Sequence, residues 1–319
     1  MLAPTRFLLV FCSGFSLLAV WGPFFWPPLD ALGQGTPVLL AINLIAVVCA
    51  VIFGRLRSNL PIACLAGLAV LSSGYAIVRG WPRAERAEPG GQPLRVATCN
   101  LWMSNRSSNE AATQLAKINA DILLLQELSP TGPLSLAAIA DAFPYKSECN
   151  YCSQAIWSRM PITVRGSSKV DWPLPQEQQQ LGIVWAKIAI NQQTEIGVVS
   201  IHLSHADTSG KQLDELDALK RVLEPFDEKT LLVGGDFNAS PDMLRYSKFV
   251  SDTGLRRVSF WPTWPDSLGS LGAPGRFPVP FMAIDHILAG SSWASMASRS
   301  EGGLGSDHYC AVAEIALQR

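Results

Sequence analysis

The sequence predicts an α/β layered sandwich attached to a membrane, and three observations indicate it. Three long apolar runs near the start of the chain carry no charged side chain. The chain that follows has ordinary polarity and alternates short strand-like segments with helical stretches. Hairpins and crossovers both connect those segments, which favours layered sheets covered by helices over a purely parallel sheet. A chain of 319 residues can hold one large domain and an appendage.

The apolar runs have the length and composition of membrane-spanning helices. They cover residues 7–26, 37–53 and 60–78, and the mean hydropathy of the whole chain is +0.20. A run of this length crosses the hydrocarbon core of a bilayer as a helix. The first run lacks a small-x-small cleavage site at its end, so we interpret it as a retained anchor and not as a cleaved signal peptide. Residues 1–80 are therefore expected to form a membrane anchor with three transmembrane helices.

Basic residues predict the orientation of this anchor. Arg6 precedes the first run and Arg55 and Arg57 lie between the second and third, whereas the first loop holds Asp30 and no basic residue. Because cytoplasmic loops are enriched in Lys and Arg, the N-terminus is expected in the cytoplasm and the chain after the third run on the outer side. Three arginines after that run favour the opposite orientation, namely Arg79, Arg83 and Arg86.

Residues 81–93 are rich in Pro, Gly and charged residues and are predicted to be a linker, and residues 94–319 are predicted to form one domain. Six of the 25 basic and three of the 26 acidic residues precede Pro89, so 19 basic and 23 acidic residues remain and acids outnumber bases by four. A non-specific nucleic-acid-binding protein usually has a basic surface, so this balance weakens a nucleic-acid function without excluding it.

The cysteines of this domain include one Cys-x-x-Cys pair, Cys149 and Cys152. A zinc site needs four ligands, and the chain has no second pair of this kind. A disulfide and two free thiols are both consistent with the sequence.

Periodicity predicts the elements of the domain in order. Alternating or short apolar segments predict strands at 94–98, 122–125, 155–158, 182–190, 195–202, 230–234, 283–289 and 309–316. Apolar residues at helical spacing predict helices at 110–119, 211–226 and 247–254. The polar segment 191–194 predicts a hairpin between its two flanking strands. Residues 261–280 are expected to form a Pro- and Gly-rich loop.

Acidic, amide and imidazole side chains stand where these strands begin or end. They are Asn100, Glu127, His202, Asp236, Asn238, Asp285, Asp307 and His308. Carboxylate oxygens are the ligands that Mg²⁺ or Mn²⁺ prefers, and such a cation polarises a phosphoryl oxygen. A His paired with an Asp can take a proton from water. Taken alone, Asp236 and Asn238 would be ordinary turn residues, but the whole set suits hydrolysis of a phosphate ester.

The ordered motifs resemble the endonuclease/exonuclease/phosphatase superfamily, the deoxyribonuclease I-like fold. They are Asn100, Gln126-Glu127, His202-Leu203, Gly235-Asp236-Phe237-Asn238, Ile284-Asp285-His286 and Ser306-Asp307-His308. The resemblance covers nearly all of the chain from 94 to 315. It implies a four-layer α/β sandwich, in which two packed mixed β-sheets are flanked by helices. Three transmembrane helices would precede this sandwich, as in a bacterial membrane-anchored member of the superfamily.

The resemblance also implies a metal site. Glu127 would be the main ligand, with Asn100 and Asp307 nearby, and the metal would be Mg²⁺ or Mn²⁺.

The expected location is a bacterial inner membrane, with the catalytic domain on the periplasmic or outer side.

The remaining residues would act on the substrate. His308 would be the general base, oriented by Asp285. Asp236 would position or deprotonate the attacking water. Asn238 and His202 would bind the phosphate and stabilise its charge in the transition state.

We therefore expect a membrane-anchored, divalent-metal-dependent hydrolase of phosphate esters, namely a phosphodiesterase, nuclease or phosphatase. The expected partners are a lipid bilayer and a substrate that is a nucleic acid, a lipid head group or a small phosphodiester; no protein partner is inferred. The alternative is a catalytically silent binding or scaffold domain of the same fold, which loss of an expected site residue would favour. A transporter would need polar groups within the membrane, and the apolar runs offer little beyond Asn43.

Overall fold

The computed structural model describes residues 3–52, 60–80, 93–128, 134–149, 151–170, 181–206, 209–266 and 280–318. The chain divides into two compact units. The first contains Met1–Trp81, His205–Leu213 and Ala239–Phe249, and the second contains Pro82–Ser204, Asp214–Asn238 and Val250–Arg319. The predicted linker at 81–93 lies outside the described residues except for its last position.

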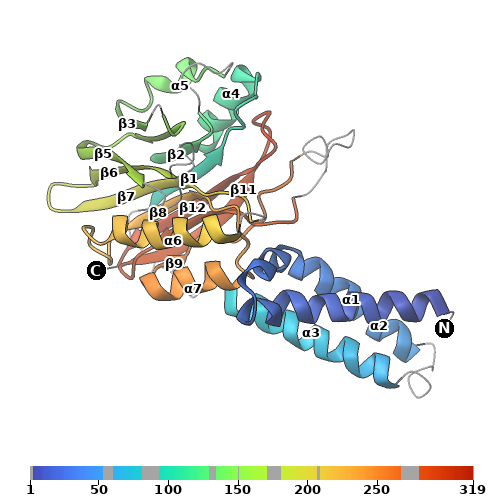
Figure 1. Cartoon of the computed structure of the whole chain (residues 1–319). Coiled ribbons are helices and arrows are strands. Elements are labelled where there is room, and N and C mark those ends of the chain that lie inside the picture. Colours follow the sequence, from blue (N-terminus) through green and yellow to red (C-terminus); the bar gives the residue numbers. More distant parts are fainter. Residues whose placement is uncertain are drawn as a thin grey trace. The chain divides into compact units, whose positions relative to one another are not determined.

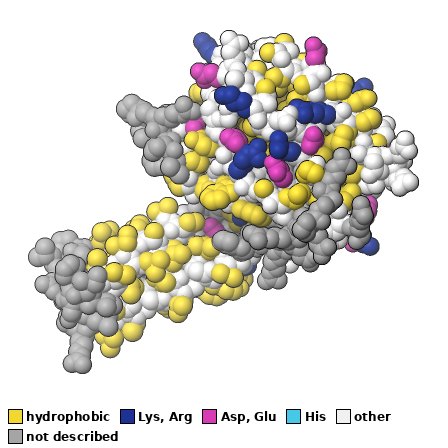
Figure 2. Space-filling model, turned by 180° about the vertical axis from the view of Figure 1, so that it is seen from behind, with side chains coloured by type: hydrophobic (Ala, Val, Ile, Leu, Met, Phe, Trp, Pro, Cys, Tyr) yellow, Lys and Arg dark blue, Asp and Glu magenta, His cyan; other side chains and the backbone are white. Residues whose placement is uncertain are grey.

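The three apolar runs form helices α1 (Ala3–Trp21), α2 (Thr36–Ile52) and α3 (Leu60–Gly80). By length and composition, three helical segments of this region can cross a membrane. Hydrophobic side chains cover much of the surface of this helical part (Figure 2). Helix α1 ends at Trp21, before the predicted end at Trp26, because Pro23 lacks a backbone N–H and cannot continue the helix. Two 3₁₀ segments follow, η1 (Gly22–Phe24) and η2 (Pro27–Gly35).

Polar side chains join these helices to one another. The Ser13 hydroxyl of α1 donates to Asn43 Oδ1 of α2 at 2.8 Å, and Asn43 Nδ2 donates to Ser16 Oγ at 2.8 Å. The Trp21 indole N–H donates to Ser72 Oγ of α3 at 2.9 Å. Hydrogen bonds of this kind stabilise helix pairs in an apolar surrounding. Asn43 therefore acts as a packing residue between α1 and α2.

The second unit is built on two six-stranded mixed sheets (Figure 1). The first sheet has the order β11 (Trp293–Glu301), β12 (Cys310–Leu317), β1 (Leu94–Asn100), β2 (Ile122–Gln126), β4 (Gln154–Ser158) and β3 (Tyr145–Cys149). The second has the order β5 (Ile162–Val170), β6 (Leu181–Ala189), β7 (Glu195–His202), β8 (Leu232–Asp236), β10 (Asp285–Ala289) and β9 (Arg256–Arg257). The predicted hairpin is confirmed as the antiparallel pair β6–β7.

The core lies between the two sheets. Alternate side chains of β1 and β2, such as Val96 and Leu124, pack there against Val198 and Leu232 of β7 and β8. Helices α4 (Ser108–Ile118) and α5 (Ala137–Ala140) cover the outer face of the first sheet. In Figure 1, helix α6 (Ser209–Leu223) runs in front of the second sheet, and α7 (Leu244–Thr253) is drawn below α6. The predicted four-layer α/β sandwich is confirmed.

The strand directions bring the polar ends together within each sheet. Strands β1 and β2 are parallel, so Asn100 and Gln126 are neighbours at their ends. Strands β7 and β8 are also parallel, and their last residues, His202 and Asp236, are paired. Strand β10 is antiparallel to β8, so its first residue, Asp285, lies opposite Asp236. Each sheet therefore presents its polar residues where these strands begin or end, on one side of the sheet.

Two disulfides lie in the second unit. Cys99 and Cys310 join β1 to β12, next to Asn100 and close to His308 in sequence. Cys149 and Cys152 form the second bridge, so of the two interpretations of this pair the structure has the disulfide. The Cys99–Cys310 bridge was not predicted, although both cysteines flank the motifs at the first and last predicted strands.

These bridges predict the thiol content of the protein. The full chain, purified from membranes without reductant and then denatured, should have three reactive thiols, those of Cys12, Cys49 and Cys64. The same sample after reduction should have seven. Titration with a chromogenic disulfide reagent measures both numbers. Seven thiols before reduction would contradict both bridges.

Candidate active site

Asn100 joins the polar ends of the two sheets. Its side-chain nitrogen donates to Glu127 Oε1 at 2.9 Å and to Asp236 Oδ2 at 3.0 Å. Glu127 directly follows β2 of the first sheet, whereas Asp236 ends β8 of the second. The Asn100 Oδ1 oxygen accepts the backbone N–H of Trp102 at 2.9 Å, which fixes the orientation of the amide. Two carboxylates from different sheets thus converge on one nitrogen atom.

Glu127 is held in a constrained turn. Its φ of 56° lies in the left-handed region, which is uncommon for a residue with a side chain and occurs often at functional sites. Its Oε2 oxygen accepts the backbone N–H of Met103 at 2.7 Å. Burial by itself raises the pKa of Glu127, but the hydrogen bonds from Asn100 and Met103 and the nearby His202 and His308 together lower it below its ordinary value. Glu127 is therefore a carboxylate, the form that binds a cation.

Asp236 reaches the site because Gly235 precedes it. Gly235 has a φ of 150°, a conformation that side chains disfavour, and a Cβ atom there would collide with the Ile201 carbonyl oxygen of the adjacent strand. The Asp236 side chain is buried. Burial and the charge of Asp285 raise the pKa of Asp236.

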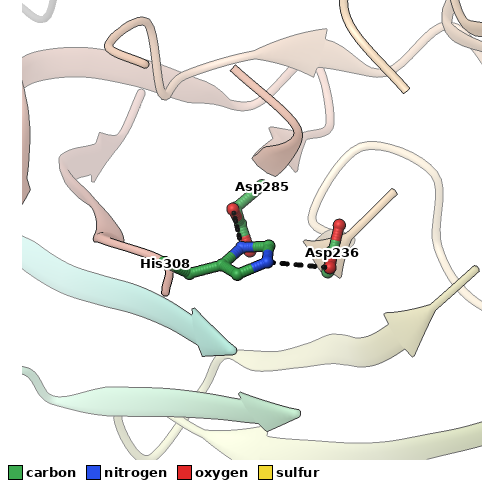
Figure 3. A group of neighbouring side chains, drawn as sticks. All are labelled: Asp236, Asp285 and His308. Atoms are coloured by element: carbon green, nitrogen blue, oxygen red, sulfur yellow. Dashed lines mark hydrogen bonds and ion pairs between the residues drawn. The ribbon is translucent and has the colours of Figure 1, made fainter. Parts of the chain in front are cut away.

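His308 lies between two of the acids (Figure 3). Its Nδ1 atom is 2.9 Å from Asp285 Oδ2, and its Nε2 atom is 3.8 Å from Asp236 Oδ2. Burial alone would lower the pKa of His308, but the charges of Asp285 and Asp236 and the hydrogen bond to Asp285 raise it to about 10. Because Asp285 occupies Nδ1, the Nε2 atom is the one directed at the site.

The two predicted phosphate-binding residues, His202 and Asn238, lie at the ends of β7 and β8 in the second sheet. His202 Nε2 is 3.7 Å from Asp236 Oδ2 and 3.9 Å from Glu127 Oε1. Asn238 has a φ of 48°; its backbone N–H donates to Asp236 Oδ1 at 2.8 Å and its side-chain nitrogen donates to the Leu203 carbonyl at 2.9 Å. The turn after β8 is therefore tied both to Asp236 and to the end of β7.

Asp307 lies within electrostatic range of Glu127 and Asp236. Burial raises the pKa of Asp307, and these two acids raise it further while His308 opposes them. The structure thus brings together all eight predicted residues: Asn100, Glu127, His202, Asp236, Asn238, Asp285, Asp307 and His308.

The donor set fits a hard divalent cation. The site contains four carboxyl groups and two imidazoles, and carboxylate oxygens are ligands that such a cation prefers. The buried Asp285 Oδ1 has no hydrogen-bond partner among the described residues. One oxygen of Asp236, one of Asp285 and one ring nitrogen of His308 lie within 4.8 Å of one another, a spacing that also suits a cation. Asn100, as oriented here, faces both carboxylates with its nitrogen, so its oxygen would reach a cation only if the amide turned over.

Further polar residues support the site. The Ser306 hydroxyl donates to the Asn100 carbonyl at 2.8 Å and accepts the His308 backbone N–H at 3.1 Å. Thr263 Oγ1 accepts the backbone N–H of Asp285 at 3.2 Å. Ser306 stands two residues before His308, a spacing typical of a hydroxyl-capped turn, so the sequence did carry a signal for it. Thr263 has no such signal because its partner lies 22 residues further along the chain.

A buried chain of hydrogen bonds lies behind these residues. Thr98 Oγ1 donates to Gln126 Oε1 at 3.1 Å, and Gln126 Nε2 donates to Ser200 Oγ at 3.0 Å. Ser200 Oγ in turn donates to Gln154 Oε1 at 3.4 Å. Buried polar groups of this kind fix a unique arrangement when each has a partner. This series of hydrogen bonds links the two sheets directly beneath the strand ends that carry the site.

Comparison with known proteins identifies a family for this chain. The sequence matches the Endonuclease/Exonuclease/phosphatase family over residues 97–308, more than half of the chain. A search of curated proteins gave no match.

Several solved structures share the fold. A family protein from Bacteroides thetaiotaomicron is 16% identical, with a TM-score of 0.56 over 72% of this chain and 99% of that one. Sphingomyelinase C from Streptomyces griseocarneus is 17% identical, with a TM-score of 0.52 over 70% and 99%. A humanised D. rerio TDP2 is 16% identical, with a TM-score of 0.53 over 70% and 98%. The match and the shared fold show that this chain belongs to the endonuclease/exonuclease/phosphatase family.

Proposed function

We propose that this chain is a membrane-anchored, divalent-cation-dependent hydrolase of phosphate esters. Members of its superfamily are phosphoric ester hydrolases. The observation that carries the proposal is the convergence of Glu127 and Asp236, from two different sheets, on the amide nitrogen of Asn100. The ring of His308 is directed at the same oxygen of Asp236. An acid pair, a base and two phosphate-binding side chains thus surround one point.

The charge balance of the site supports cation dependence. Its four carboxylates exceed its two imidazoles in charge, so an anionic phosphate ester would be repelled unless positive charge were added. Glu127 would hold the cation, with Asp307 and a turned Asn100 as further ligands. When bound, Mg²⁺ or Mn²⁺ would polarise a phosphoryl oxygen, offset the charge of the transition state and favour the neutral form of nearby histidines.

His308 is proposed to take the proton of the attacking water. Its Nδ1 atom is held by Asp285 at 2.9 Å, so Nε2 is the acceptor. The proton ends on Nε2, and Asp285 stabilises the resulting imidazolium. Asp236 is 3.8 Å from Nε2 and would orient the water between the ring and the phosphorus atom.

His202 and Asn238 are proposed to bind the phosphate. The ring N–H of His202 and the Asn238 amide would donate to its non-bridging oxygens, where charge accumulates in the transition state. Donors that are already oriented stabilise that charge without reorganising at the moment of reaction. The bonds of Asn238 to Asp236 and Leu203 provide this orientation.

The proposed location is a bacterial inner membrane with the catalytic unit on the periplasmic side. Three helical segments long and apolar enough to cross a membrane, together with Arg6, Arg55 and Arg57, favour this orientation. The two disulfides add independent support, because disulfides persist in oxidising compartments and are rare in the cytosol.

The charge balance of the chain after Pro89, with 19 basic and 23 acidic residues, favours a lipid head group or a small phosphodiester over a nucleic acid. On the face seen in Figure 2, basic and acidic side chains are intermingled and do not form a continuous basic surface. On β1, β11 and β12, Arg95 and Arg299 both pair with Glu314. A nucleic-acid groove needs unpaired basic side chains to contact phosphates.

Removal of the main ligand or of the base should abolish catalysis. We expect Glu127→Gln and His308→Gln to lower kcat/KM by about 10²- to 10⁴-fold, because each deletes a group that acts on the reacting atoms. The assay uses the full chain in detergent with Mg²⁺ or Mn²⁺ on phospholipids, an aryl phosphodiester and single- and double-stranded DNA. Chelation by EDTA should remove the activity, and the cation should restore it.

Glu110→Gln is the matched control, since Glu110 is an exposed glutamate on α4. It should retain wild-type activity. Equal activity of the wild type and both site variants would contradict the site assignment. A wild type inactive on every substrate would instead favour the scaffold alternative.

The proposed orientation predicts where a C-terminal fusion is exposed. A reporter enzyme that is active only outside the cytoplasm should be active when fused after Arg319. Fused after Arg57, between the second and third helices, the same reporter should be inactive. The reverse pattern would place the catalytic unit in the cytoplasm.

A further inference from the structure

Within the first unit, Asp30 caps a helix that follows it by more than two hundred residues. Asp30 lies in η2, between α1 and α2. Its Oδ1 accepts the backbone N–H of Leu244 at 2.6 Å, and its Oδ2 accepts the backbone N–H of Arg245 at 2.9 Å. These are the first N–H groups of α7, which have no acceptor within their own helix. A carboxylate also suits the positive end of the helix dipole.

An ion pair reinforces the cap. Arg245 Nε donates to Asp30 Oδ2 at 2.7 Å, and the two side chains are only 1% and 4% exposed. The same guanidinium donates to Gln212 Oε1 at 3.1 Å and to the Pro27 carbonyl at 3.3 Å. Loss of one partner of a buried pair leaves the other charge buried without compensation. Asp30 and Arg245 together thus connect three distant parts of the chain.

The end of α3 contacts the segment just before this helix. Arg79 Nη2 donates to the Asp242 carbonyl at 2.8 Å. At Gly80, the last residue of α3, a Cβ atom would collide with the Pro241 carbonyl oxygen, so only glycine permits this approach. The backbone from Pro241 to Arg245 is therefore fixed by η2 and by the end of α3.

This segment continues directly from the turn that carries Asn238. Five residues, 239–243, separate Asn238 from the capped Leu244, and the turn at Asn238 is left-handed. We propose that Asp30, by fixing the segment that directly follows Asn238 in the chain, is a positioning residue for Asn238. This inference rests on the proposed role of Asn238 in binding the phosphate.

The test replaces Asp30 in the full chain, purified in detergent. Asp30→Asn keeps the shape but removes the charge and one acceptor. We expect faster hydrogen–deuterium exchange in peptides covering 239–249. We also expect kcat to fall by about tenfold or more, because a small displacement of a group that binds the transition state slows the reaction strongly. KM should stay within about twofold. Because kcat is normalised to the monodisperse fraction, a simple loss of folded protein would not produce the fall in kcat.

Asp214→Asn is the matched control, because Asp214 is an exposed aspartate on α6, and it should change neither quantity. If Asp30→Asn does not yield folded protein, Arg79→Gln removes a single contact to the same segment and should shift exchange and kcat in the same directions. Unchanged exchange at 239–249, or an unchanged kcat, in the folded variant would overturn the proposal. A wild type no more active than Glu127→Gln would refute the proposed function instead, and unchanged exchange would then still refute the cap.

Discussion

Before a cation binds, the candidate site depends on one hydrogen-bonding group, the side-chain nitrogen of Asn100. Glu127 and Asp236 are both acids, so their ionised forms repel each other. A single donor within 3.0 Å of both holds them together, and it does so across the boundary between the two sheets. The buried chain from Thr98 to Gln154 fixes the same boundary from below. The chemistry of the site is therefore a consequence of how the two sheets pack.

The central strands were predictable from the sequence, and the edge strands were not. Strands β1, β2, β7 and β8 are buried apolar runs whose composition specifies them locally. By contrast β11, with the sequence WASMASRSE, has few of the residues that favour strands, and its register comes from pairing with β12. Strands β3, β5 and β9 were also not predicted. Because β3, β9 and β11 each pair with only one neighbour, tertiary contact decides their structure.

The same contrast holds for the site. Its eight side chains were predictable because each stands at a strand end, and the order of the motifs resembles a known family. The groups that hold them were not predictable, because their partners are remote in sequence. Cys99 and Cys310 are 211 residues apart, and Asp30 and Leu244 are 214 apart. In the sequence, Asp30 lies in a loop between two apolar helices and indicates only membrane topology. In the folded chain it also caps α7.

The convergence of both sheets on one cation is tested most directly by anomalous X-ray diffraction from crystals of the full chain grown with Mn²⁺. We expect one peak about 2.1 Å from a Glu127 carboxylate oxygen and no peak in Glu127→Gln crystals. A peak held by Asp236, Asp285 and His308 that persists in the Glu127→Gln variant would contradict it. That result would assign His308 to the metal and leave the proposed reaction without its base.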